Sequence, residues 1–249
     1  MAIAYNWLYN ISMDNLLLLH GALGSADTLT PLQQALEDKY NIHKLDFSGH
    51  GKSSIPQEPY SMALFSNDIL SYLDTQGLDK VHILGYSMGG YVALYFALLH
   101  PERVSSIFTL ATKFAWSPEA AEKECRMLNP KKIKEKVPQF AKVLAERHAP
   151  NDWKQVMHKT AEMMQQLGAV PELTAANLPQ IQLPVRLSIG DSDNMVTVEE
   201  TLWAYRLLPN ASLLVLPATR HPLEIIEINR LAYEAEQFIN NCLPVTKIV

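Results

Sequence analysis

Short apolar runs alternate along this chain with longer stretches in which apolar residues recur at helical spacing. Six runs are short and apolar enough to be buried strands, at residues 16–19, 42–45, 81–84, 104–110, 185–189 and 213–216. Most are followed by a turn containing Gly or Asp and then by an amphipathic stretch, such as 28–40 or the helix that Ser61 would cap and that runs to about Thr75. Strands that alternate with helices predict an α/β fold, a parallel sheet flanked by helices.

The alternation stops between about residues 113 and 183. No strand-like run occurs there, whereas residues 118–128, 131–148, 152–167 and the stretch near Leu173 have helical periodicity. The pattern therefore predicts a core formed by residues 1–112 and 184–249, with an all-helical cap, residues 113–183, inserted between two strands.

Composition and charge narrow the class of protein. The chain has 249 residues, of which 48% are hydrophobic and 19% charged, and this excludes intrinsic disorder. A net charge of −5 provides no positive field for nucleic acid or anionic lipid, and we interpret the basic run at residues 131–136 as a solvated helix face. No apolar stretch approaches the length of a membrane helix, residues 1–14 do not resemble a signal peptide, and the two cysteines, Cys125 and Cys242, suit a reducing compartment. We expect a soluble cytoplasmic protein.

The sequence Gly85-Tyr86-Ser87-Met88-Gly89 lies where the predicted strand 81–84 turns into a helix. Such an abrupt turn brings backbone segments close together, so only glycine fits two residues before and two residues after the serine. The turn would hold Ser87 outward at the carboxyl edge of the sheet, as the candidate nucleophile. The alternative is a serine in an ordinary packing turn.

A nucleophilic serine needs a base, and the base needs an orienting acid. Among the histidines after Ser87, only His221 lies in a loop after the last strand, and Pro222 keeps it extended. Asp191 and Asp193, after strand 185–189, are the candidate acids. Thr197 begins a capping-box pattern with Glu200, which leaves Asp193 in mid-loop, whereas Asp191 at the strand end is better placed to accept turn N–H bonds.

The tetrahedral intermediate of acyl transfer needs two backbone N–H donors. Met88, directly after the candidate nucleophile, would supply one, and Ala22, or failing that Leu23, the other. We interpret His20 as a residue that shapes this loop by a hydrogen bond, and the Asp46–Ser53 loop as a structural turn beside the site.

The motifs His20-Gly21, Asp46-x-x-Gly49-x-Gly51-x-Ser53, Gly85–Gly90, Gly190-x-x-Asp193 and His221 together resemble the α/β-hydrolase superfamily, from about Leu16 to Phe238. The resemblance is to the cap-bearing branch with esterases, lactonases and carbon–carbon bond hydrolases. It implies a mostly parallel eight-stranded sheet with an N-terminal hairpin within residues 2–19, and it favours Asp193 as the acid. A serine nucleophile argues against haloalkane dehalogenases and epoxide hydrolases, and Arg220 before the histidine is unusual, pointing either to solvent or to a substrate carboxylate.

These observations predict a serine hydrolase that cleaves a small carboxylic ester, a lactone or a similar acyl compound, with Ser87, Asp193 and His221 as its triad and Ala22 and Met88 as its oxyanion hole. The chemistry requires neither a metal nor an organic cofactor. We expect a small-molecule acyl substrate as partner, no nucleic acid or membrane, and a monomer or homodimer. Candidate residues for the lining of the cap are Phe114, Trp116, Met127, Met163 and Met164, unless they pack within it. The alternatives are an acyltransferase, a carbon–carbon bond hydrolase or lyase, a perhydrolase, and a non-catalytic ligand receptor.

Overall fold

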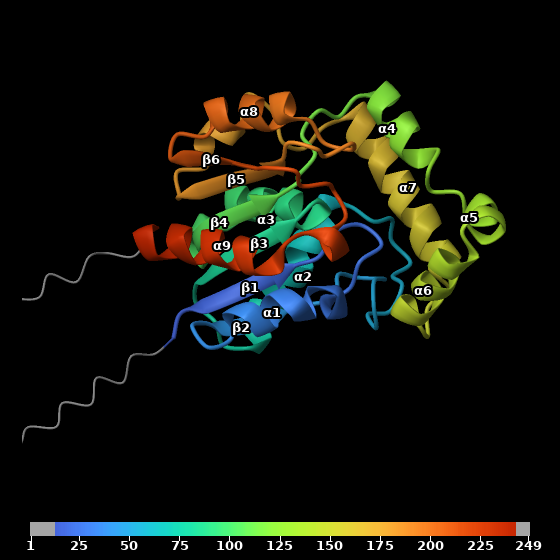
Figure 1. The fold of residues 1–249 in the computed structure, drawn as a ribbon, viewed down its shortest axis with the longest axis horizontal. Coiled ribbons are helices and arrows are strands. Elements are labelled where there is room, and N and C mark those ends of the chain that lie inside the picture. The colour runs from blue at the N-terminus through green and yellow to red at the C-terminus, as the bar shows by residue number, and fades with distance from the viewer. Residues whose placement is uncertain (1–12, 243–249) are drawn as a thin grey trace, which may run out of the picture.

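The strands form one parallel sheet with helices on both faces (Figure 1) in the computed structural model, which describes residues 13–242. The order is β2-β1-β3-β4-β5-β6, with each neighbouring pair parallel. The strands are β1 (Asn15–Leu19), β2 (Asn41–Lys44), β3 (Val81–Tyr86), β4 (Val104–Leu110), β5 (Val185–Gly190) and β6 (Ala211–Leu216). The expected α/β fold is confirmed. The described residues contain six strands, not eight, and the part of the expected hairpin before residue 13 lies outside them.

Successive residues of β1 enter two different cores. Leu17 and Leu19 pack on the face covered by α2 (Met62–Thr75), α3 (Met88–Leu99) and α8 (Val198–Leu207). Leu16 and Leu18 pack on the opposite face, under α1 (Thr30–Leu36) and α9 (Ile228–Cys242). Because both faces are covered, all four leucines are fully buried, which explains why the strand is a continuous apolar run.

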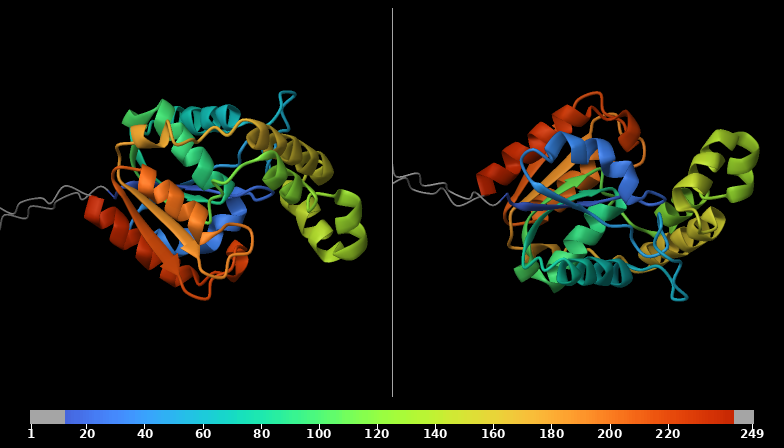
Figure 2. Two further views of the ribbon diagram at one scale, coloured as in Figure 1. Left: turned by 90° about the horizontal axis from the view of Figure 1, so that it is seen from above. Right: turned by 90° about the horizontal axis from the view of Figure 1, so that it is seen from below.

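The segment between β4 and β5, here called the helical insertion, projects from one side of the molecule (Figure 2). It contains α4 (Pro118–Cys125), α5 (Pro130–Lys136), α6 (Pro138–His148) and α7 (Trp153–Ala169), and α4 packs on α7. The single helix expected over 131–148 is wrong: Val137 leaves the helical region, with φ −137° and ψ 61°, because the proline that follows it disfavours helical angles. A helix near Leu173 is also wrong, since residues 170–184, all of them described, contain only turns and the short 3-10 helix Leu178–Gln180.

The two predicted helix N-caps are present. The Ser61 side chain accepts the N–H of Leu64 at 3.1 Å, and the Thr197 side chain accepts the N–H of Glu200 at 3.1 Å. Glu200 does not complete the expected capping box, because its Oε1 instead accepts the N–H of Phe114 at 3.0 Å. Within residues 13–242, no helix is both long enough and apolar enough to cross a membrane.

Candidate active site

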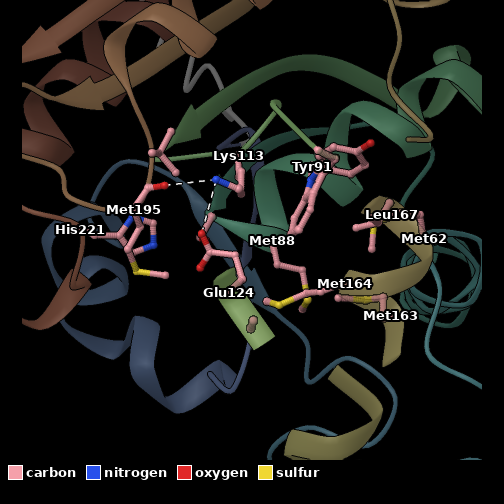
Figure 3. Close-up of a pocket in the computed structure, with 14 residues that line it drawn as sticks. Met62, Met88, Tyr91, Lys113, Glu124, Met163, Met164, Leu167, Met195 and His221 are labelled. Atoms are coloured by element: carbon pink, nitrogen blue, oxygen red, sulfur yellow. Dashed lines mark hydrogen bonds and ion pairs between the residues drawn. The ribbon is translucent and has the colours of Figure 1, made fainter. Parts of the chain in front are cut away.

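The site lies where the chain reverses its direction of travel across the sheet. β2 and β3 flank β1 on opposite sides, and such a switch point leaves a crevice beyond the carboxyl ends of the strands. The loops after β1 and β3 border a cavity there, with the helical insertion opposite (Figure 3). The cavity has a volume of about 50 Å³. Its lining residues are Ala22, Met62, Ser87, Met88, Tyr91, Lys113, Trp116, Glu124, Met163, Met164, Leu167, Met195, Val196 and His221.

Ser87 occupies the strained turn between β3 and α3. Its φ of 51° lies in the left-handed region, and its backbone N–H donates to Leu110 O at 2.7 Å. A side chain at Gly85 would meet the backbone of Gly89 at 2.5 Å, and a side chain at Gly89 would meet Leu19 O at 2.5 Å. The two glycines are therefore required sterically, for the reason inferred from the sequence.

The structure brings Asp193 and His221 together. Their loops follow β5 and β6, and His221 Nδ1 donates to Asp193 Oδ2 at 2.8 Å, with side-chain exposures of 7% for the histidine and 1% for the aspartate. Burial raises the pKa of the Asp193 carboxyl, but the hydrogen bonds from His221 and from the N–H groups of Val196 and Met195 outweigh it, so the pKa lies below its ordinary value. Asp193 is therefore held as a carboxylate against the imidazole.

The backbone of His221 is fixed from a second direction. The Tyr86 hydroxyl donates to His221 O at 2.9 Å, and burial raises the pKa of that phenol, so it remains a donor. Ser87 and His221 border the same cavity, and within the described residues no hydrogen bond joins the serine Oγ to the ring.

Arg220 is exposed, as one interpretation of it predicted. The expectation that Asp191 accepts turn N–H bonds is wrong: Asp191 is exposed and, among the described residues, accepts only from the Ser192 hydroxyl, whereas Asp193 accepts the N–H groups of Met195 and Val196.

Both candidate oxyanion donors border the cavity. Met88 begins α3, and among the described residues neither its N–H nor that of Ala22 donates a hydrogen bond. The Gly21 carbonyl, in the same peptide group as the Ala22 N–H, accepts from Gly24 N at 3.0 Å and from His20 Nδ1 at 2.8 Å. Because the peptide group is planar and trans, these bonds direct the Ala22 N–H to the opposite side. This supports the interpretation of His20 as a loop-shaping residue.

The helical insertion also contacts the loop that contains Ala22, through two residues that the sequence reasoning missed. At the end of α6, Arg147 Nη1 and His148 Nε2 both donate to Leu23 O, at 2.8 and 3.2 Å, and Leu23 itself has a φ of 58°. His148 is fully buried, and its Nδ1 accepts the N–H of Gly51 at 3.0 Å, so its proton resides on Nε2. Burial lowers the pKa of His148 to about 4, which keeps the ring neutral.

The cavity wall is mostly apolar, and it carries one pair of charged residues. Trp116, Met163 and Met164 line the cavity as expected; Phe114 is buried outside it, and Met127 is half exposed. Lys113 and Glu124, which the sequence reasoning did not single out, form an ion pair on this wall. In residues 13–242, no group of three or more His, Cys, Asp or Glu side chains could hold a metal ion.

A family model described as the alpha/beta hydrolase fold matches residues 14–147, more than half of the 249 residues. The chain belongs to the α/β hydrolase fold family. The match spans β1 to nearly the end of α6, about half of the helical insertion, and includes Ser87, Ala22 and Met88. The predicted superfamily membership is thereby confirmed.

Individual relatives of this α/β hydrolase are named esterases and hydrolases. The chain is 27% identical over 241 residues to a pimeloyl-[acyl-carrier protein] methyl ester esterase from Aeromonas hydrophila, covering 86% of this chain and 93% of that protein. The fold of the present chain is similar to that of a thermophilic esterase from Thermogutta terrifontis, with a TM-score of 0.75 and 20% identity over 93% of this chain and 91% of that chain. It is also similar to that of the enol-lactonase from Burkholderia xenovorans LB400, with a TM-score of 0.73 and 18% identity over 92% of each chain. The expectation of an enzyme of the hydrolase class is confirmed.

Proposed function

We propose that this chain hydrolyses a small carboxylic ester, a lactone or a similar acyl compound through an acyl-enzyme on Ser87. The observation that carries the proposal is the buried Asp193–His221 hydrogen bond, whose imidazole borders the same cavity as the serine of the strained turn. The name of the methyl ester esterase relative supports an ester rather than another bond.

In the proposed reaction, His221 Nε2 takes the proton of the Ser87 hydroxyl while Oγ attacks the acyl carbon. The N–H groups of Met88 and Ala22 donate to the oxyanion, and the Asp193 carboxylate stabilises the imidazolium. The tetrahedral intermediate collapses by breaking the bond to the leaving alcohol, which takes the proton from His221. Water then attacks the acyl-enzyme with His221 again as base, and the acid leaves as Ser87 regains its proton.

We further infer that residues 113–183 act as a cap over a core of residues 1–112 and 184–249. The cavity side chains contributed by α7 and by the segment before α4 support this, because they face the loops that carry Ser87 and His221. The substrate would be a small molecule enclosed between the two parts. The two free cysteines, Cys125 and Cys242, favour a cytoplasmic location.

Covalent labelling tests the nucleophile. A fluorophosphonate probe should add one mass to the protein, located by peptide mass spectrometry at Ser87, and the Ser87→Ala protein should neither react nor release acid from an ester panel. Ester turnover with labelling at another residue, or with no labelling, contradicts the proposal.

A further inference from the structure

Two opposite charges lie on the wall of the largely apolar cavity. Lys113 lies three residues after the end of β4, and Glu124 lies on α4 of the helical insertion; the Lys113 Nζ and Glu124 Oε1 atoms are 3.4 Å apart. Figure 3 shows the pair between Met195 and His221 on one side and Met88 and Met164 on the other. The side-chain exposure is 16% for the lysine and only 4% for the glutamate, so both charges are largely withdrawn from bulk water.

The hydrogen-bonding capacity of this pair is not used up. An ammonium has three N–H donors, and Lys113 directs one to Met195 O at 3.3 Å besides its contact with Glu124. A carboxylate accepts at about four positions, yet within the described residues Lys113 is the only polar side chain paired with that of Glu124. A wholly apolar substrate that filled the cavity would exclude water from these donor and acceptor positions and offer them no hydrogen bond. Burying polar groups without a hydrogen-bond partner is unfavourable.

The net charge of the pair decides which ligand group fits. A second carboxylate would have to share one ammonium with Glu124, and an added ammonium would leave two cations on one carboxylate, each in a poorly solvated cavity. A hydroxyl or a primary amide both donates and accepts, so it can donate to Glu124 and accept from Lys113 without adding charge. We propose that the substrate carries such an uncharged hydrogen-bonding group, which binds at the Lys113–Glu124 pair. This inference rests on the proposed function, because it concerns the same cavity.

A matched series of methyl esters, X–CH₂CH₂–CO–OCH₃, tests the group while the rest of the molecule stays constant. X is methyl, hydroxyl, carboxamide, carboxylate or ammonium, and a second series carries the same groups on the alcohol part of an acetate ester. In one of the two series we expect kcat/KM for hydroxyl or carboxamide to exceed that for methyl by about tenfold or more. A preference for a charged group, or no preference in either series, overturns the inference.

The variant Glu124→Gln keeps the shape of the side chain and removes its charge. We expect it to reduce the advantage of the hydroxyl ester over the ester in which X is methyl by about tenfold. Glu122→Gln, on the same helix but 66% exposed, is the matched control and should change neither rate. An equal loss on every ester in Glu124→Gln would assign the pair a purely structural role.

Calorimetric titration of the esters into the Ser87→Ala protein distinguishes this inference from the proposed function. It measures binding without hydrolysis and leaves Lys113 and Glu124 unchanged. The esters in which X is hydroxyl or carboxamide should bind about tenfold more tightly than the ester in which X is methyl. Preferential binding without hydrolysis by the wild-type protein contradicts the proposed function alone. Hydrolysis with equal binding of all the esters contradicts this inference alone.

Discussion

Asp191 and Asp193 occupy one loop, and their surroundings give them different chemistry. Asp193 Oδ2 accepts from the His221 ring and Oδ1 accepts two backbone N–H groups, whereas Asp191 is exposed and accepts from the neighbouring Ser192 hydroxyl. We expect Asp193→Asn to lower kcat by about 10⁴-fold, because the amide would select the wrong imidazole tautomer. Asp191→Asn should leave kcat within about twofold. Steady-state kinetics on proteins shown by circular dichroism to be folded checks both, and the reverse ranking would make Asp191 the acid.

Two substitutions of His148 test how its ring supports the Ala22 loop, because each substitution keeps a different one of the two hydrogen bonds that the ring makes. The side-chain nitrogen of Gln can replace Nε2 as donor to Leu23 O, while the side-chain oxygen of Asn can replace Nδ1 as acceptor for Gly51 N. If the bond to Leu23 positions the Ala22 N–H, His148→Asn should lower kcat by about tenfold with KM nearly unchanged, and His148→Gln should not. Both variants lose one buried bond, so equal effects on kcat would indicate a general loss of stability.

The proposed triad was predictable residue by residue, whereas its supports were not. Ser87 and His221 have local signatures, a glycine-flanked turn and a histidine held extended by Pro222. Arg147 and Lys113 have none, because their partners, Leu23 O and Glu124, are set by how the helical insertion packs against the loops. Periodicity shows which face of a helix is apolar but not which loop its end will contact.

At the scale of elements, Trp116 connects the helical insertion to the cavity. It lies just before α4 and lines the cavity together with Met163 and Met164 of α7. Trp116→Ala should change the preference among acyl-chain lengths more than it changes kcat/KM for a small acetate ester, because only longer chains would reach the space it vacates. The measurement is kcat/KM over an acyl-chain series. An equal decrease on every ester would mean that the residue supports folding or chemistry instead.

Strands and capped helices were easier to predict than the interior of the helical insertion. All six apolar runs became strands, β1 to β6, with shifts of their ends of at most two residues, and Ser61 caps α2 as expected. Residues 131–148 kept an apolar periodicity across the break at Val137, so the pattern alone did not separate α5 from α6. Pro138 was the available signal, since a proline inside a helical pattern ends the helix at the residue before it.

For the whole molecule, buried histidines couple stability to pH. Burial lowers the pKa of both His20 and His148 to about 4, and that of His50 lies well below its ordinary value of 6.5. Between pH 6.5 and 4 the unfolded chain therefore binds more protons than the folded one, and the free energy of unfolding should fall as the pH is lowered. Each such histidine adds a slope of up to about 1.4 kcal/mol per pH unit. The raised pKa values of Asp68 and Glu172 act in the opposite direction.

Urea unfolding at pH 7, 6 and 5 measures this slope. The lowered pKa of Asp193 contributes only below its ordinary value of 3.8, so it does not enter this range. His148→Gln should reduce the slope by the contribution of one histidine. A free energy of unfolding that is constant from pH 7 to pH 5 would contradict the assignment of neutral buried rings.

The methionines around the cavity also have a consequence for oxidant exposure. Five methionine side chains line the cavity, those of Met62, Met88, Met163, Met164 and Met195. Peroxide converts a thioether into a sulfoxide, which is polar and chiral, and dedicated reductases reverse the change. Oxidation would therefore alter which acyl chains the cavity accepts while Ser87, Asp193 and His221 stay chemically intact, so that damage and repair would be reflected first in substrate choice.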